Sequence, residues 1–124
     1  MPRTAFSTEL APQPKNPVSQ CVRAGNIVAP AGQTGRLLDG TLPSDIEGQT
    51  RAAFANLIAV LASGGASESD VVHVRVYLTD QENIGVVNKA FETTFSQPYP
   101  ARTAIYVGLR AGVLVEVDAL AVID

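Results

Sequence analysis

The closing segment of the chain, residues 113–123, is apolar along both of its faces, and this constrains the fold more than any other stretch. In an extended strand, successive side chains point to opposite faces of the sheet. One face then carries Val115, Val117, Ala119 and Ala121, and the other carries Glu116, Asp118, Leu120 and Val122. A strand with apolar residues on both sides needs cover on both faces. Helices can cover one face, and we expect a second copy of the chain to cover the other in a symmetric homo-oligomer.

Two segments have the residue spacing of amphipathic helices. The first follows Ser44-Asp45-Ile46-Glu47, which matches a capping box with Ser44 at the N-cap, and it ends at Gly64-Gly65. The second runs from about residue 83 to residue 95, where Gln97-Pro98-Tyr99-Pro100 stops it. The predicted apolar stripes are Ile46, Thr50, Ala53, Phe54, Leu57, Ile58 and Leu61 in the first helix, and Ile84, Val87, Phe91 and Phe95 in the second.

Strands are predicted around these helices, at residues 4–8, 19–23, 26–31, 71–79, 103–109 and 113–123. Gly25 and Asn26 are expected to supply the positive φ of a tight hairpin, residues 32–43 to form a loop, and residues 110–112 to join the last two strands in a hairpin. In the strand at 71–79, one face is predicted to hold Val72, Val74, Val76 and Leu78. This order of elements predicts an α+β sandwich, a single domain over residues 1–124, with both helices on one face of one mixed sheet.

Composition excludes several classes of function. The chain of 124 residues has a net charge of −3 and no stripe of Lys and Arg, which argues against a nucleic-acid or anionic-membrane partner. No apolar stretch approaches the length of a membrane span, and residues 1–14 lack the apolar core of a signal peptide. Cys21 is the single cysteine and has no internal disulfide partner, so we expect a cytoplasmic protein.

Arg102 and Glu116 are the side chains best suited to chemistry. Arg102 lies at the mouth of a strand just after Pro100, and its planar guanidinium can hold a carboxylate through two hydrogen bonds. Glu116 lies between Val115 and Val117, where desolvation raises a carboxyl pKa toward the range useful for proton transfer. Together they predict a site that fixes a small anionic molecule and moves a proton. The alternative is a structural ion pair between Arg102 and a carboxylate of the last strand.

The remaining candidates are weaker. Asp118 lies on the face of Glu116 and is expected to pair with Arg102 or Arg75, or to meet a neighbouring subunit. Asn88 lies near the apolar stripe of the second helix and either contacts a ligand or is only solvated. The only histidine, His73, lies in an alternating strand and is read as structural. With one histidine and one cysteine, no metal site is predicted.

Several motifs resemble the reactive intermediate deaminase family, which is also called the YjgF or L-PSP endoribonuclease family. Pro-Ala-Arg-Thr at residues 100–103 together with the acidic closing strand is the most specific of these motifs. The Gly25-Asn26 turn, Ala-Gly-Gln at residues 31–33 and Val-Asn-Lys-Ala-Phe at residues 87–91 follow the family pattern in order and spacing. The resemblance covers nearly the whole chain.

The resemblance implies a chorismate-mutase-like fold in a homotrimer, with the sheets facing inward and three clefts between subunits. It implies a hydrolase that converts 2-imino or 2-enamino acids to 2-keto acids and ammonia without a metal or an organic cofactor. Arg102 would clamp the substrate carboxylate, and Glu116 would activate the attacking water with help from the backbone carbonyl of Ala104. Asn88 would line the cleft.

The chain departs from the family pattern at three places. Val18 takes the position of a Tyr that deaminating members place in the cleft, and Ala104 replaces a frequent Cys. The last hairpin is expected to be one residue shorter than in typical family members, which would shift the register of Glu116 against Arg102. With such a shift, Asp118 would take over part of the role of Glu116. Two alternatives to a deaminase therefore stay open: a non-catalytic or regulatory binder of small carboxylates, favoured by Val18, and a ribonuclease or translation inhibitor, disfavoured by the acidic charge balance.

Overall fold

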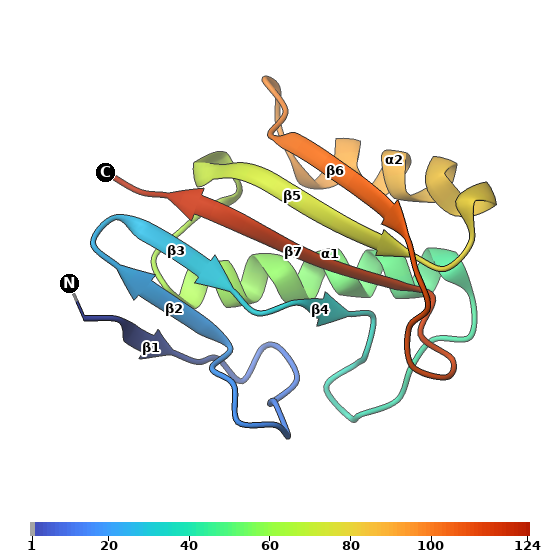
Figure 1. Cartoon of the computed structure of the whole chain (residues 1–124), viewed down its shortest axis with the longest axis horizontal. Coiled ribbons are helices and arrows are strands. Elements are labelled where there is room, and N and C mark those ends of the chain that lie inside the picture. The colour runs from blue at the N-terminus through green and yellow to red at the C-terminus, as the bar shows by residue number, and fades with distance from the viewer. Residues whose placement is uncertain (1) are drawn as a thin grey trace.

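A computed structural model describes residues 2–124 of the chain. The seven strands form one sheet in the order β1-β2-β3-β7-β5-β6, with β4 paired to β7 beside the end of β3 (Figure 1). Pairing is antiparallel except between β5 and β6, so the sheet is mixed. The strands are β1 Thr4–Phe6, β2 Cys21–Ala24, β3 Ile27–Pro30, β4 Gln33–Thr34, β5 Val71–Leu78, β6 Ala101–Tyr106 and β7 Val115–Val122.

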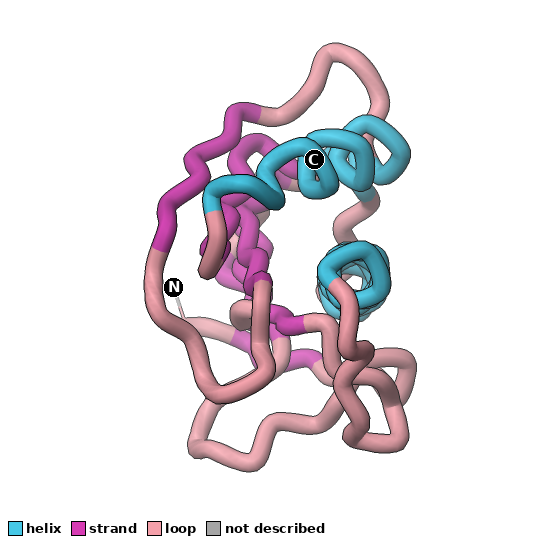
Figure 2. The backbone as a smooth tube through the Cα atoms, turned by 90° about the vertical axis from the view of Figure 1, so that its right-hand side faces the viewer, coloured by secondary structure: helices cyan, strands magenta, loops and turns pink. Residues whose placement is uncertain are grey.

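Both helices lie on the same face of the sheet and leave the opposite face open (Figure 2). They are α1 Ile46–Ser63 and α2 Ile84–Thr94, and short 3₁₀ turns at Glu68–Asp70 and Gln81–Asn83 precede β5 and α2. The predicted α+β class, the single mixed sheet and the placement of both helices on one face are confirmed. Within residues 2–124, no helix combines the length and apolar character needed to cross a membrane.

The core lies between the helices and the covered face of the sheet. The face of β7 that carries Val115 and Val117 is fully buried there, as are Val74, Val76 and Leu78 of β5. Phe54 of α1 packs edge-on against Phe91 of α2 and against Phe95, with ring centroids 6.3 and 6.1 Å apart. These aromatic contacts fix α2 beside α1 and so set the position of β6, which follows α2 in the chain.

Three local predictions were wrong because they depend on backbone geometry that residue type does not specify. Asp45, not Ser44, is the N-cap of α1, and no side chain caps that end. In the β2–β3 turn only Gly25 has positive φ, at 59°, and Asn26 does not. In β5 a shift in register between Val71 and His73 buries Val71 and leaves Val72 47% exposed.

Two predictions of connectivity were also wrong. The last two strands do not form a hairpin, because β5 lies between β6 and β7 and pairs with both. The predicted loop at residues 32–43 contains the short strand β4, where Thr34 lies opposite Glu116 of β7. Both differences bear on the functional site, because they place β4 and β5 on either side of Glu116.

Candidate active site

Glu116 lies on the open face of β7, flanked by Tyr77 of β5 and Thr34 of β4. Its side chain is half-buried. Burial raises the pKa of the Glu116 carboxyl above its ordinary value, and the negative charge of Asp118 raises it further, while Arg110 acts in the opposite direction. A carboxylate whose pKa is raised by desolvation is a better proton acceptor near neutral pH than a solvated one.

Asp118, the other carboxylate on this face, is already occupied by partners. Arg75 Nε donates to Asp118 Oδ1 at 2.7 Å, and the Tyr77 hydroxyl donates to Oδ2 at 2.9 Å. The Arg75–Asp118 contact is the one ion pair within residues 2–124, and it raises the pKa of Arg75. The hydrogen bond to Asp118 raises the pKa of Tyr77, while the charge of Arg75 acts in the opposite direction. The predicted pairing of Asp118 with Arg75 is therefore confirmed, and Glu116 is the carboxylate left free for chemistry.

The Glu116 carboxylate lies directly against the backbone of Gly32. A methyl group at residue 32 would overlap Glu116 Oε2 and the carboxylate would have to move, so the glycine lets the backbone lie close to the carboxylate in its present position. The backbone thus fixes one side of the carboxylate, and β5 holds the strand on its other side.

Replacing Gly32 with alanine is expected to displace the Glu116 carboxylate without disrupting the core, because Gly32 is exposed. If Glu116 acts on a bound molecule, a displacement of this kind costs about 10-fold to 100-fold in kcat/KM. Steady-state kinetics and a thermal melt of Gly32→Ala measure the two effects separately. Gly85→Ala is a matched control, because nothing lies within 4 Å of a methyl group at that position. A wild-type rate for Gly32→Ala would show that the placement of this carboxylate is unimportant.

Glu116 opens into a cleft of about 470 Å³ that is rich in arginine. The lining residues are Thr34, Arg36, Gly108, Leu109, Arg110, Val113 and Glu116. A second hollow of about 220 Å³ shares Thr34 and Arg36 with this cleft and is lined by Val18 and Gly32 among others. Val18, which is 55% exposed, therefore lines a hollow next to the Glu116 cleft.

Arg102 lies on the opposite face of the sheet from Glu116. Its partner across β5 is Val74, which is buried beneath the helices, whereas Glu116 lies opposite the open-face residue Tyr77. The Arg102 guanidinium packs over the Phe91 ring of α2, with its carbon 5.1 Å from the ring centroid. The structural ion pair of Arg102 with Glu116 or Asp118 is therefore absent, and the two predicted catalytic residues are not brought together within one chain.

Asn88 and Ala104 lie on the Arg102 side. Asn88 is exposed on α2, one helical turn before the Phe91 that contacts Arg102. Ala104 follows Arg102 on the same face of β6, which is an edge strand. Val107 N–H donates to the Leu78 carbonyl, so the backbone of residue 107 faces β5. Because successive residues of a strand direct their N–H and C=O groups to opposite sides, those of Arg102 and Ala104 point away from β5. The predicted site residues thus fall into two separate groups, which we call half-sites: Arg102, Ala104 and Asn88 form one group, and Glu116 and Val18, with Gly32, form the other.

Comparisons with known proteins identify the family of the chain. Residues 8–123 match the family model described as Endoribonuclease L-PSP. The chain belongs to the Rid/YjgF/L-PSP family. A RutC family protein of Pyrococcus abyssi is 38% identical over 128 residues and covers 98% of each chain. A 2-iminobutanoate/2-iminopropanoate deaminase of Dermatophagoides farinae is 34% identical over 126 residues, which is 99% of this chain and 98% of the other.

The fold of this Rid-family chain is also that of solved relatives. The crystal structure of RidA from the Antarctic bacterium Psychrobacter superposes with a TM-score of 0.92 at 34% sequence identity, covering 97% of this chain and 99% of that one. The predicted family membership is confirmed over almost the whole chain.

Sequence reasoning missed two buried amides of α1 that position the loops around Glu116. Gln49 donates to the carbonyls of Pro43 and Gly112, both at 2.8 Å, and accepts from Leu114 N–H at 2.9 Å. Asn56 donates to the carbonyls of Thr34 and Arg36 at 3.0 and 2.9 Å. The two amides are seven residues apart, on one face of the helix. Polar residues at buried helical positions were the available signal, since such groups need partners.

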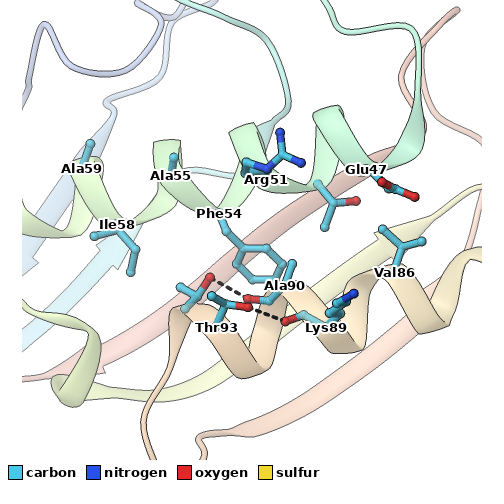
Figure 3. Close-up of a pocket in the computed structure, with 12 residues that line it drawn as sticks. Glu47, Arg51, Phe54, Ala55, Ile58, Ala59, Val86, Lys89, Ala90 and Thr93 are labelled. Carbon is cyan, nitrogen blue, oxygen red and sulfur yellow. Dashed lines mark hydrogen bonds between the residues drawn. The ribbon is translucent and has the colours of Figure 1, made fainter.

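A separate hollow in the Rid-family chain lies between α1 and α2 on the outer side of the molecule (Figure 3). It has a volume of about 800 Å³ and an apolar lining that includes Phe54, Ile58 and Ala90. None of the predicted site residues lines it, so its size alone does not make it the active site.

His73 and Cys21, which were also considered from the sequence, lie outside the cleft that Glu116 lines. His73 contacts the Thr103 hydroxyl at 3.2 Å on the open face. Cys21 is fully buried, and burial raises the pKa of its thiol. No group of three or more His, Cys, Asp or Glu side chains within residues 2–124 is placed to hold a metal ion.

Proposed function

We propose that the chain is a deaminase that hydrolyses a small 2-imino or 2-enamino carboxylate to a keto acid and ammonia. The observation that carries this proposal is Glu116, a half-buried carboxylate with a raised pKa, which lies against Gly32 in an open cleft while Arg75 and Tyr77 bind Asp118. Family relatives named 2-iminobutanoate/2-iminopropanoate deaminase, at about a third identity over nearly the full length, support the same reading.

The chemistry needs little besides positioning and one base. The protonated imine carbon is electrophilic, and Arg102 would hold the adjacent carboxylate through two charged hydrogen bonds. Glu116 would accept a proton from water as the water oxygen bonds to this carbon, and would then give that proton to the departing nitrogen. As the C–N bond breaks and the C=O bond forms, the hydroxyl proton passes to solvent, which balances the proton that the imine took up. An imino acid and one water thus become a keto acid and one ammonia, with no electron transfer. An enamine enters the same route after protonation at its β carbon.

Because Arg102 and Glu116 lie on opposite faces, the complete site requires two copies of the chain. A ring of identical subunits joins two different surfaces of the protomer, so the Arg102 half-site of one copy can meet the Glu116 half-site of the next. We propose the homotrimer that the family resemblance implies. The open face has the apolar surface that such an interface needs: Ile27, Ile105, Leu120 and Val122 are each between 39% and 46% exposed there.

Leu120→Glu is expected to convert the oligomer to a monomer and to abolish imine hydrolysis, because it places a charge in the apolar part of the open face. Sedimentation analysis at micromolar concentration measures the mass, and the same sample is assayed. Leu10→Glu, at an apolar residue that is 71% exposed in the N-terminal segment, is the control. A wild-type chain that sediments as a monomer and still hydrolyses the imine would contradict the composite site.

The activity itself is tested with an imine made in the cuvette. An amino-acid oxidase acting on 2-aminobutanoate supplies 2-iminobutanoate, and the added chain should raise the rate of ammonia and keto-acid formation well above that of buffer. A rate equal to buffer, with 2-iminobutanoate and with larger imines, would reject the deaminase function.

A second candidate is a non-catalytic binder of small carboxylates, and Val18 is the observation that favours it. The isopropyl group of Val18 lines the hollow beside Gly32 at the position where the family resemblance implies a Tyr hydroxyl, so a polar contact to a substrate would be missing. Saturable binding of 2-oxobutanoate without turnover of any imine would favour this function over the deaminase.

A further inference from the structure

We propose that Arg36 and Arg110 form a second anion-binding subsite beside Glu116, and that the preferred substrate is therefore a 2-imino or 2-enamino dicarboxylate. This inference rests on the proposed deaminase function and adds its substrate class. It starts from the cleft of about 470 Å³, in which these two arginines and Glu116 are lining residues. Neither arginine forms an ion pair, since Arg75–Asp118 is the sole ion pair in the described part of the chain.

The Arg36 side chain is held in place by the fold. Its Nη1 donates to the Gly40 carbonyl at 2.9 Å, which uses one of the five donors of the guanidinium. Asn56 of α1 holds the backbone carbonyl of Arg36 at 2.9 Å. The loop beyond it is closed by the Leu37 N–H bond to Thr41 and by the Asp39 side chain on Thr41. The remaining donors are therefore presented by an ordered loop, which lowers the entropy lost on binding an anion.

Arg110 is positioned by the same helix from the other side of the cleft. It begins a tight turn in which its carbonyl accepts from Val113 N–H at 2.9 Å and Gly112 has a φ of 83°. Gln49 of α1 clamps that turn through the Gly112 carbonyl and Leu114 N–H. Two buried amides of one helix thus hold the two arginine-bearing loops beside one carboxylate.

The charges in the cleft match a dianion better than a monoanion. Glu116 and the two arginines sum to one positive charge, and Arg102 of the neighbouring protomer would add a second. The second carboxylate of a dicarboxylate offsets one of these positive charges, whereas a monocarboxylate leaves that charge uncompensated in a partly dehydrated cleft. An uncompensated cation also opposes the raised pKa that Glu116 needs as a base, as the effect of Arg110 on that pKa already shows.

The experiment compares imines made from glutamate and from 2-aminobutanoate by amino-acid oxidases. The wild-type chain should show a kcat/KM about 10-fold or more higher for 2-iminoglutarate than for 2-iminobutanoate. Arg36→Ala and Arg110→Ala should each lower that ratio by about 10-fold to 100-fold, the size of a lost charged hydrogen bond. Arg51→Ala, at an exposed arginine in the groove between the helices, should keep the wild-type ratio.

Binding of the unreactive products separates this inference from the proposed function. 2-Oxoglutarate should bind more tightly than 2-oxobutanoate in calorimetry, and Arg36→Ala should remove the difference. If neither imine is hydrolysed but this difference appears, the deaminase fails and the subsite stands. If both imines are hydrolysed but neither arginine variant changes the ratio, the deaminase stands and the subsite fails.

Discussion

Glu116→Gln is expected to lower kcat/KM for imine hydrolysis by about 10²-fold to 10⁴-fold, the range assigned to a positioned general base. The substitution keeps the shape of the side chain and removes its ability to accept a proton from water. Glutamine at this position still fits against Gly32 and between β4 and β5, so the cleft keeps its form. Rates of keto-acid formation from 2-iminobutanoate, measured for both chains, give the ratio.

The pH dependence of stability and activity tests whether Glu116→Gln loses activity through the missing base rather than through a less stable fold. Burial holds the pKa of Glu116 above its ordinary value, so the folded chain binds this proton more tightly than the unfolded chain does. Ionisation of Glu116 therefore costs stability as the pH rises through the raised pKa. Glu116→Gln should be at least as stable as the wild type at pH 8, and the activity of the wild type should fall as the pH drops through that pKa. A Gln variant that keeps the wild-type rate would remove Glu116 from the mechanism.

Arg102→Ala is expected to reduce kcat/KM by about 10²-fold to 10⁴-fold, because two charged hydrogen bonds to the substrate carboxylate are lost. The kcat/KM of Arg102→Lys should lie between those of the wild type and Arg102→Ala, since an ammonium keeps the charge without the planar guanidinium. Losing the contact with Phe91 costs only about 0.5–1 kcal/mol of stability, so a thermal melt should change little. Unchanged hydrolysis by Arg102→Ala would contradict its role as the carboxylate clamp.

A mixed oligomer tests whether the two residues act from different copies. If each site takes Arg102 from one protomer and Glu116 from the next, co-expressed Arg102→Ala and Glu116→Gln chains should rebuild about one quarter of the sites. Neither variant alone rebuilds any. Activity of the mixture at the level of the better single variant would show that the site is not shared in this way.

Local sequence patterns predicted most helices and strands, because the formation of a helix or strand depends largely on residues close together in the chain. The spacing of Phe54, Leu57 and Leu61 indicated α1, and Gly64-Gly65 marked its end. The alternation in the closing strand correctly separated the buried face of Val115 and Val117 from the face of Glu116. The same patterns missed β4 and predicted a hairpin between β6 and β7, because pairing between distant segments leaves no mark on the local sequence.

For the candidate site too, the sequence predicted some features and the tertiary structure decided the others. From the sequence alone came the residue types that could do the chemistry, Arg102 and Glu116, the departure at Val18 and the family motifs that connect them. Only the tertiary structure decided that Arg102 and Glu116 lie on opposite faces, and that Arg75 and Tyr77 occupy Asp118. It also placed Arg36 and Arg110 in one cleft with Glu116. The physical reason is that side-chain periodicity sets the face of each residue within its own strand, whereas strand order and register decide which residues share a site.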